Sequence, residues 1–555
     1  MSTSLPAGAP RAAQHAAPSP AVATRSDAAR PATLLQQALL LGISADALLR
    51  YSLVGPALAL WVVILALAVP ALAWSADRTV PRESAGWVAV AFLFACCSAW
   101  RASDVLRALD LLAVLAALGM AGIALRDDRL GLRAQRLRDT IWAAAAIIGN
   151  VARGIVPLAL RQLFHAERDT QVAGRTRAVA RAVIIASALL VIFGSLLRSA
   201  DPIFARLVVL PDVDFGNVAS HVVFALAFAW IAGGWAYGAF IADTSGPRPP
   251  EQSPFTLGIV DLTTALGTLN ALFGVFVLTQ LGWFFGGEHF LRETTGLTAA
   301  EYARRGFFQM VWVVVLVVPI LLATRVALRP ERGLARRHTQ LSLPIVALLG
   351  AIILSAALRM RLYVHFYGLT IDRMLTLVFM GWLAVVLVAL ALTVLRDRGR
   401  PFAATSIVSG LMMLVGLHLF VPDVVVARVN VARTSIASRD RAAPLDLPYL
   451  TLLSADAVPI ATTATLVAGH TRGAFAGDPE GDTRLCEAST TLLQRWGAES
   501  AIERRAKLDV DWRTWNAGEQ RARRVVDADA GALQSLRNAT CPNAAKKTPS
   551  RAAQR

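Results

Sequence analysis

Long apolar runs recur along most of the chain and alternate with short polar segments rich in arginine. A helix of about 20 apolar residues crosses the hydrocarbon core of a bilayer. Eleven segments approach this length: 34–50, 53–74, 86–100, 107–125, 182–198, 220–241, 262–286, 308–328, 343–360, 373–395 and 402–422. The first is the weakest, because it is short and contains Asp46 and Arg50. The pattern predicts an all-α fold, a polytopic transmembrane helix bundle of about 11 spans.

The segment 141–164 is apolar enough to span, but its polar residues share one helical face. They follow one another at helical spacing, as Asn150, Arg153, Pro157, Arg161 and His165. Arginines also crowd both ends of the segment, so a span would place one of the two arginine clusters outside. A helix in the cytoplasmic interface keeps both clusters inside. The pattern therefore predicts an interfacial helix within an arginine-rich cytoplasmic region at 126–181.

The composition agrees with a membrane protein. Apolar residues make up 55% of the chain and charged residues only 17%, whereas soluble domains carry about a quarter charged residues. A net charge of +17 would also suit a nucleic-acid-binding protein, but most of the arginines lie between apolar runs. Cytoplasmic loops of membrane proteins carry this excess of basic residues. We therefore expect the lipid bilayer, and not nucleic acid, as the partner.

The distribution of arginine also predicts the topology. The first 33 residues are rich in Ala, Pro and Ser and have no apolar core, which indicates a disordered cytoplasmic tail rather than a signal peptide. Eleven crossings from a cytoplasmic N-terminus place the arginine-rich loops inside. The predicted parts are the tail 1–33, a first group of transmembrane helices at 34–125, the cytoplasmic region 126–181, a second group of transmembrane helices at 182–422 and an extracytoplasmic domain at 423–555.

The segment 423–555 contains no further span and is predicted to form a small helical extramembrane domain. Cys486 and Cys541 are its only cysteines. An oxidising compartment would allow them to pair, and closing a loop of that size would contribute about 4 kcal/mol of stability. Two unrelated buried thiols are the alternative. Cys96 and Cys97 lie in a predicted span and are interpreted as small packing residues.

Several polar clusters fall at the outer ends of the predicted spans or just beyond them. Arginine suits the bidentate binding of a carboxylate or a phosphate. The hypothetical outer-face ligand site consists of Arg198, Asp201, Glu301, Arg304, Arg305, Arg361, Tyr367, Arg373, Asn430 and Asp446. The alternative is a rim in which arginines anchor at head groups, tyrosines form an aromatic belt and acids pair locally.

Motifs of familiar catalytic sites are absent from the sequence. It contains no P-loop, no GxSxG, no paired zinc motif and no dinucleotide fingerprint. The histidines show no metal-ligand spacing such as HExxH, so neither a metal nor another cofactor is predicted. The clearest deep polar groups are Asn270 and Gln280, and no carboxylate lies mid-span, which disfavours an ion-coupled carrier. Gly234 and Gly238 form a GxxxG pair that permits close helix packing.

The polar clusters resemble a bacterial membrane-protein family known as domain of unknown function 4173, which is related to domain of unknown function 4153. The motifs that carry the resemblance are "LLRSADPIFA" (195–204), "EYARRGFFQMV" (301–311), "RLYVHFYGLTIDRM" (361–374), "RVNVAR" (428–433), "DLPYLTLLSADAVP" (446–459) and "DWRTWNAGEQRAR" (511–523). The resemblance covers roughly residues 180–525. It implies a multi-span protein of the inner membrane, and it brings no catalytic residues with it.

Three functions fit these observations. The favoured one is a non-enzymatic inner-membrane protein whose outer face binds a ligand or a protein partner in envelope sensing, signalling or assembly. The second is a transporter or flippase of an anionic or lipidic substrate, which a water-filled cavity reaching Asn270 would favour. The third is a membrane-embedded transferase with Glu301 or Asp201 as the base, which needs a groove that joins the lipid to that carboxylate.

Overall fold

The computed structural model describes residues 31–75, 78–126, 137–154, 215–241, 256–295, 307–396, 402–436, 445–471, 479–498 and 511–545, and the single positions 156, 182, 186, 189 and 193. Within these residues the regular structure is helical, and the only β-type pairing is one isolated bridge between Leu257 and Leu328. The predicted all-α fold is therefore confirmed.

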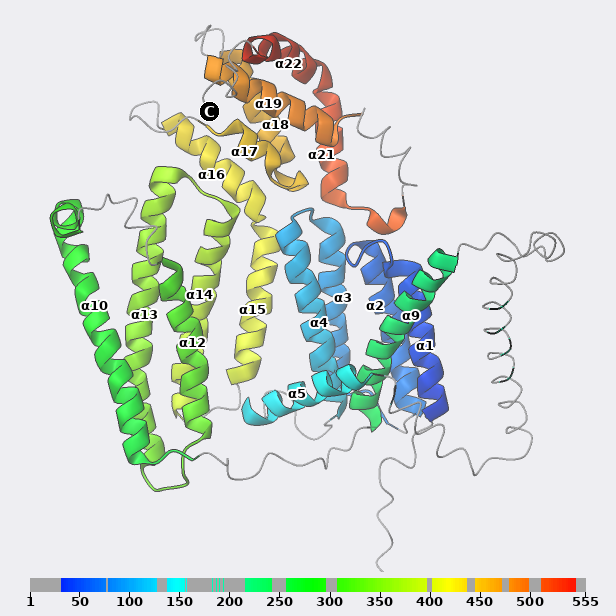
Figure 1. The fold of residues 1–555 in the computed structure, drawn as a ribbon, viewed down its shortest axis with the longest axis vertical. Helices are drawn as coiled ribbons and strands as arrows, with labels where there is room; N and C mark the ends of the chain where they lie inside the picture. The colour runs from blue at the N-terminus through cyan, green and yellow to red at the C-terminus, as the bar shows by residue number, and fades with distance from the viewer. Residues whose placement is uncertain are drawn as a thin grey trace, which may run out of the picture.

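Nine helices in the described part of the chain are long and apolar enough to cross a membrane. They are α2 (Pro56–Ser75), α3 (Arg82–Trp100), α4 (Asp104–Arg126), α9 (Phe215–Ala236) with its π-helical continuation η2 (Tyr237–Ile241), α10 (Ile259–Thr295), α12 (Phe307–Val326), α13 (Leu334–Tyr367), α14 (Ile371–Leu392) with η3 (Val394–Arg396), and α15 (Phe402–Leu419). Figure 1 shows these helices side by side in one bundle. The prediction of a polytopic membrane protein is confirmed.

The two remaining predicted spans have different outcomes. The segment 34–50 forms α1 (Pro31–Leu49), whose apolar part is shorter than those of the nine candidate spans. The segment 182–198 lies almost entirely outside the described residues. The number of about 11 spans therefore stays a prediction.

Helix α5 (Leu137–Arg153) runs across the ends of its neighbours instead of along them (Figure 1). This direction suits the predicted interfacial helix. The polar stripe, however, does not face water at every position, because Asn150 is buried. A Cβ added at Gly234 would lie 2.5 Å from the Asn150 carbonyl oxygen, and one at Gly238 would lie 2.9 Å from Asn150 Nδ2. The GxxxG pair, with Gly234 in α9 and Gly238 in η2, thus permits the close approach of α5.

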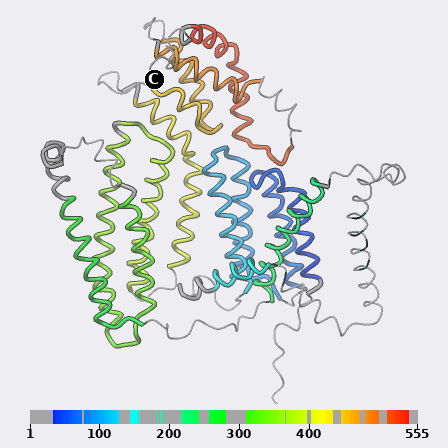
Figure 2. The backbone as a smooth tube through the Cα atoms, in the orientation of Figure 1, coloured from blue at the N-terminus to red at the C-terminus, as the bar shows by residue number. Residues whose placement is uncertain are grey.

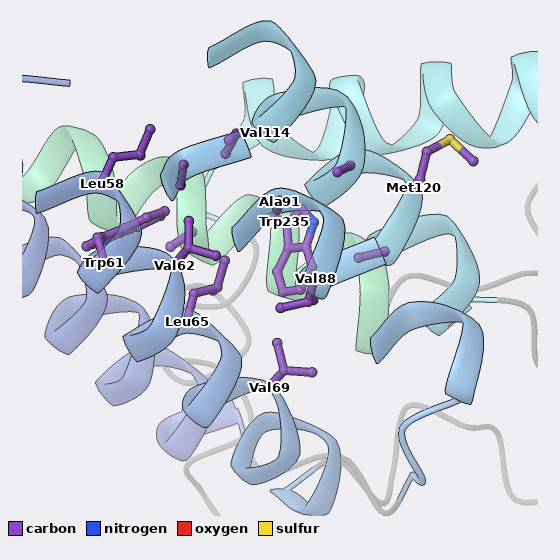
Figure 3. Packing of buried hydrophobic residues seen from close by; sticks show 14 of the residues in the cluster. Leu58, Trp61, Val62, Leu65, Val69, Val88, Ala91, Val114, Met120 and Trp235 are labelled. Carbon is purple, nitrogen blue, oxygen red and sulfur yellow. The ribbon is translucent and has the colours of Figure 1, made fainter. Parts of the chain in front are cut away.

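The bundle has two apolar cores. One is formed mainly by α1 to α5, α9 and α15, and Figure 3 shows part of it, including Trp61, Val88 and Trp235. The other is formed by α10, α12, α13 and α14. Large apolar side chains also point outward, as Leu67 does with 73% of its surface exposed. Lipid tails are as apolar as leucine, so a bilayer accommodates these side chains without cost.

A third core belongs to a helical unit at one end of the bundle (Figures 1 and 2). This C-terminal unit contains α16 (Pro422–Ile436), α17 (Leu447–Leu452), η5 (Ala455–Ala457), α18 (Val458–Thr471), α19 (Pro479–Trp496), η7 (Trp512–Thr514), α21 (Ala517–Ala528) and α22 (Ala530–Ala545). Its core includes Ala102 from the α3–α4 loop and Leu369 from the α13–α14 loop. The unit therefore packs directly on these two loops. Cys486 of α19 and Cys541 of α22 form a disulfide bond within it.

Candidate functional site

The α13–α14 loop has a conformation that only glycine accommodates easily. Gly368 has a φ of +81°, which L side chains rarely adopt. A Cβ at this position would also lie 2.6 Å from an Arg433 guanidinium nitrogen and 2.9 Å from Asn430 Oδ1. Both side chains belong to α16. The glycine therefore permits close contact between this loop of the bundle and the first helix of the C-terminal unit.

Asn430 fixes the same loop with two hydrogen bonds. Its Oδ1 accepts from the Leu369 amide at 2.9 Å, and its Nδ2 donates to the Leu369 carbonyl at 2.8 Å. Both polar backbone groups of one loop residue are thereby satisfied by one side chain. This matters because an unpaired backbone group away from water is costly.

Arg373 lies in the first turn of α14 and folds back over the end of α13. It donates to the carbonyl oxygen of Tyr367 at 3.2 Å and to that of Gly368. Its guanidinium carbon also lies 4.2 Å from the centroid of the Tyr363 ring. Within the part of the chain that the structure describes, no carboxylate lies within ion-pair distance of Arg373. Its positive charge is therefore not neutralised by a salt bridge there.

Helix α17 brings a tyrosine to the start of α14. Asp446 caps α17 by accepting a hydrogen bond from the Tyr449 amide at 3.0 Å. The Tyr449 hydroxyl oxygen accepts from the Ile371 amide at 3.3 Å. Burial raises the pKa of the Tyr449 hydroxyl, so the group stays protonated at neutral pH. Its own proton remains available for another acceptor.

These groups surround a pocket of about 700 Å³ between the bundle and the C-terminal unit. This volume falls in the range of small-molecule sites. Its apolar lining comes from Val105, Met360, Ile371, Leu452 and Leu453, and its polar lining from Ser103, Asp104, Tyr363, Thr370, Asp372, Arg373, Thr376, Asp423, Tyr449, Ser454 and Arg495. The walls belong to α4, α13, α14, α16, α17 and α19, so parts of both the bundle and the C-terminal unit form the pocket.

Asp423 is the pocket residue whose hydrogen bonding is least complete. Only 4% of its surface is exposed. One carboxylate oxygen accepts from the Ser454 amide at 2.9 Å, but the other is buried and has no hydrogen-bond partner among the described residues. The Ser454 hydroxyl beside it is also buried without a partner there. Buried polar groups are normally satisfied, so this corner is suited to a ligand that supplies a donor.

A second polar contact fixes the C-terminal unit next to the pocket. Asp456 accepts a hydrogen bond from the Ala102 amide at 2.7 Å, and an Arg101 guanidinium nitrogen lies 3.9 Å from its other oxygen. Burial raises the pKa of the Asp456 carboxyl. Asn516 donates to the Arg101 carbonyl at 2.8 Å. The α3–α4 loop is thus bound from two sides by the C-terminal unit.

The structure separates the residues of the hypothetical ligand site. Arg373 lines the pocket, Asn430 and Asp446 hold its wall segments in place, and Tyr367 is exposed beside Arg373. Arg361 is exposed and does not line the pocket. The remaining predicted residues lie outside the described part of the chain: Arg198, Asp201, Glu301, Arg304 and Arg305.

The sequence-based prediction did not include three important pocket residues. Tyr449 lies inside the "DLPYLTLLSADAVP" motif and could have been selected as an aromatic hydrogen-bonding residue. Asp423 follows the last predicted span directly, but a single acid at that point gives no special signal. Arg495 comes from α19, far along the chain, and donates to the Thr451 carbonyl at 2.8 Å. Among the described residues, no group of three His, Cys, Asp or Glu side chains could hold a metal ion.

Comparison with known proteins gives one match. The model of a family described as domain of unknown function (DUF4153) matches residues 88–464, about two thirds of the chain. The matched part contains Gly368, Arg373, Asp423, Asn430 and Tyr449, and it ends before Arg495. No curated protein and no solved structure matches the chain. The resemblance to domain of unknown function 4173 stays a prediction.

Proposed function

The chain belongs to the DUF4153 family, and we propose that this member is a non-enzymatic, multi-pass inner-membrane protein whose pocket binds a ligand at the outer face. The observation that carries the proposal is the pocket of about 700 Å³ between the bundle and the C-terminal unit. A molecule in this pocket contacts α14 of the bundle together with α16, α17 and α19 of the C-terminal unit. Its binding therefore alters the position or stability of that unit, which suits a role in envelope sensing, signalling or assembly.

The position of the arginines supports an outer-face pocket. Helices α3 and α13 end at the loops that contact the C-terminal unit, so their first residues lie at the opposite end of the bundle. That opposite end carries Arg78, Arg82, Arg329, Arg332, Arg336, Arg337 and Arg396. By the positive-inside rule this end is cytoplasmic. The Cys486–Cys541 bond also suits an oxidising compartment on the other side.

Transport is less well supported by the geometry. Asn270 donates to the Leu341 carbonyl of α13 at 2.8 Å and to the Leu266 carbonyl of its own helix at 2.9 Å, so both of its N–H groups are already used within the bundle. It is not part of the lining of the described pocket. The residues that a transferase would use as a base, Asp201 and Glu301, lie outside the described residues. Ligand binding therefore remains the function that the described geometry favours.

Native mass spectrometry of the full-length protein, released from nanodiscs, tests the proposal. The substitution Thr376→Trp adds a large side chain to the pocket wall on α14. Val388→Trp is the matched control, because it lies on the same helix, is exposed to lipid and does not line the pocket. We expect a bound molecule in the wild type and in Val388→Trp, and a loss of that molecule in Thr376→Trp. Identical spectra for all three proteins would contradict the proposal.

A further inference from the structure

The start of α14 provides one half of a binding site, which suits an anion. The side chain of the N-cap residue Thr370 makes no capping hydrogen bond. The Ile371 amide is occupied by Tyr449, whereas the amides of Asp372 and Arg373 have no acceptor among the described residues. The free amides and the helix dipole at an N-terminus favour negative charge.

Two side chains add donors to the same place. The Arg373 guanidinium uses one nitrogen for the carbonyl oxygens of Tyr367 and Gly368, so further N–H groups remain. The Tyr449 hydroxyl accepts from Ile371 and keeps its own proton for an acceptor. Guanidinium, hydroxyl and helix N-terminus together match the several oxygens of a phosphate group.

Asp423 provides the other half, which suits a cation with N–H groups. Its second carboxylate oxygen is buried in the pocket wall without a donor among the described residues. A primary ammonium can donate a hydrogen bond to that oxygen, whereas a quaternary ammonium has no N–H group. The ring of Tyr363 is already covered by Arg373, so it is not free to form an aromatic cage for a quaternary ammonium.

The charges of the whole pocket argue against a purely anionic ligand. Asp372 and Asp423 balance Arg373 and Arg495 in the lining, and the exposed Asp104 pairs instead with Arg107 at 3.7 Å. A ligand that carries only negative charge upsets this balance and offers no donor to Asp423. A zwitterion places its phosphate at Arg373 and its amine at Asp423, and it leaves no buried charge without a partner.

The apolar wall and the position of the pocket point to a lipid as the source of this chemistry. Val105, Met360 and Leu452 line the pocket, and Leu452 is 66% exposed. The pocket lies where α4 and α14 begin and α13 ends, at one end of three candidate spans. Head groups occupy this level of a bilayer, just beyond its hydrocarbon core of about 30 Å.

We propose that the pocket binds the phosphate and primary amine of a zwitterionic phospholipid of the phosphatidylethanolamine type, an inference that rests on the proposed ligand-binding function. The phosphate lies at the start of α14 beside Arg373 and Tyr449. The amine donates to Asp423. The acyl chains follow the apolar wall toward the bilayer.

Lipid retention by the full-length protein tests this assignment. The protein is reconstituted in nanodiscs with equal fractions of phosphatidylethanolamine, phosphatidylcholine and phosphatidylglycerol, and the lipids that stay bound after release are identified by native mass spectrometry. We expect phosphatidylethanolamine to be retained on the order of tenfold over either competitor, which corresponds to one charge-assisted hydrogen bond. Equal retention of phosphatidylethanolamine and phosphatidylcholine would overturn the assignment.

Two variants separate the halves of the site. Asp423→Asn keeps an oxygen for the Ser454 amide but removes the charge, so it should abolish the preference for phosphatidylethanolamine over phosphatidylcholine. Arg373→Gln should weaken the retention of all three phospholipids together. Asp527→Asn is the matched control for charge removal, because Asp527 is exposed on α21 and away from the pocket lining, and it should retain the wild-type preference. An unchanged preference in Asp423→Asn would contradict the role of this carboxylate.

A further arm identifies the source of the head group and separates the two proposals. Soluble phosphoethanolamine is added to the protein in nanodiscs of phosphatidylcholine alone. If the wild type binds phosphoethanolamine and Asp423→Asn does not, the result supports recognition of a phosphate and an amine, but it makes a soluble molecule the ligand. If the wild type retains a molecule of another class and Thr376→Trp loses it, the phospholipid assignment is overturned, but the proposed ligand-binding function stands. If nothing is retained in any arm, the proposed ligand-binding function fails as well.

Discussion

Asn430 on α16 holds both polar backbone groups of Leu369, with its side-chain oxygen 2.9 Å from the Leu369 nitrogen and its side-chain nitrogen 2.8 Å from the Leu369 oxygen. Leu369 itself is buried in the core of the C-terminal unit. The pair therefore joins a loop of the membrane bundle to the helices beyond it. This connection also shapes the pocket, because the next residues, Thr370 and Ile371, line it.

Removing this connection should destabilise the protein. Asn430→Ala leaves the amide and the carbonyl of Leu369 without their partners, and the expected loss in the free energy of unfolding is about 2 kcal/mol. Unfolding in detergent, followed by tryptophan fluorescence, measures the effect. Asn538→Ala on α22 is the control, because Asn538 is exposed and its loss should change stability by less than about 0.5 kcal/mol. Equal stability of the two variants would contradict the structural role of Asn430.

Substitution by alanine should have different effects on stability at two glycines that lie near each other in sequence. Gly368→Ala introduces a Cβ at a φ of +81° and into contact with Arg433 and Asn430, which should cost about 1–3 kcal/mol. Gly381→Ala, in the middle of α14, meets no atom within 4 Å. It should be neutral or stabilise the helix by up to about 1 kcal/mol. Thermal unfolding of both variants measures the change in stability relative to the wild type. A destabilised Gly381→Ala together with an unaffected Gly368→Ala would refute the prediction.

The buried carboxyl of Asp456 should make stability depend on pH. Burial raises its pKa above the ordinary value of 3.8, so the folded protein holds this proton more tightly than the unfolded chain. The contribution of Asp456 to the free energy of unfolding is therefore largest below pH 3.8 and decreases as the pH rises through the folded-state pKa.

Comparison of the wild type with Asp456→Asn isolates this effect, because asparagine does not titrate. The free energy of unfolding of the wild type, relative to that of the variant, should decrease between pH 3.5 and pH 7. Denaturant unfolding at several pH values measures the difference. A relative stability that increases over this range would mean that Arg101 and the Ala102 amide outweigh burial and lower the pKa of Asp456.

Cysteine labelling tests the side of the membrane on which the C-terminal unit lies. A membrane-impermeant maleimide is added to intact spheroplasts with and without prior reduction. We expect Cys486 and Cys541 to react only after reduction, because they are joined in a disulfide and the proposed topology places them on the outer side. The double variant Cys486→Ser/Cys541→Ser keeps Cys96 and Cys97 on α3 and gives the background. Labelling that requires a breached membrane would invert the topology.

The helices themselves were largely predictable from the sequence. The length of an apolar run decides whether a helix crosses a bilayer, and this property is local, so the nine candidate spans coincide with nine of the predicted segments. The direction of α5 was also suggested by arginines at both of its ends. The burial of Asn150 was not suggested by the sequence, because it depends on the two glycines that α9 and η2 place against it.

The pocket, in contrast, could be predicted only in part. Arg361 and Arg373 look alike in the sequence, and both were expected in the site, yet only Arg373 lines the pocket. The difference comes from the α13–α14 loop, which reverses the chain between them. Asp423 and Tyr449 reach the start of α14 only because α16 and α17 pack on that loop.

The order of residues is enough to predict the membrane-spanning class, most of the helices and the alternation of basic and apolar segments, because these properties follow from residues that are neighbours along the chain. Helix packing determines which polar residues share a pocket, and it leaves one oxygen of Asp423 without a hydrogen-bond partner among the described residues. The contact between Ile371 and Tyr449 joins positions 78 residues apart, and that between Leu369 and Asn430 joins positions 61 residues apart. Such contacts depend on packing between helices, and no local pattern in the sequence encodes them.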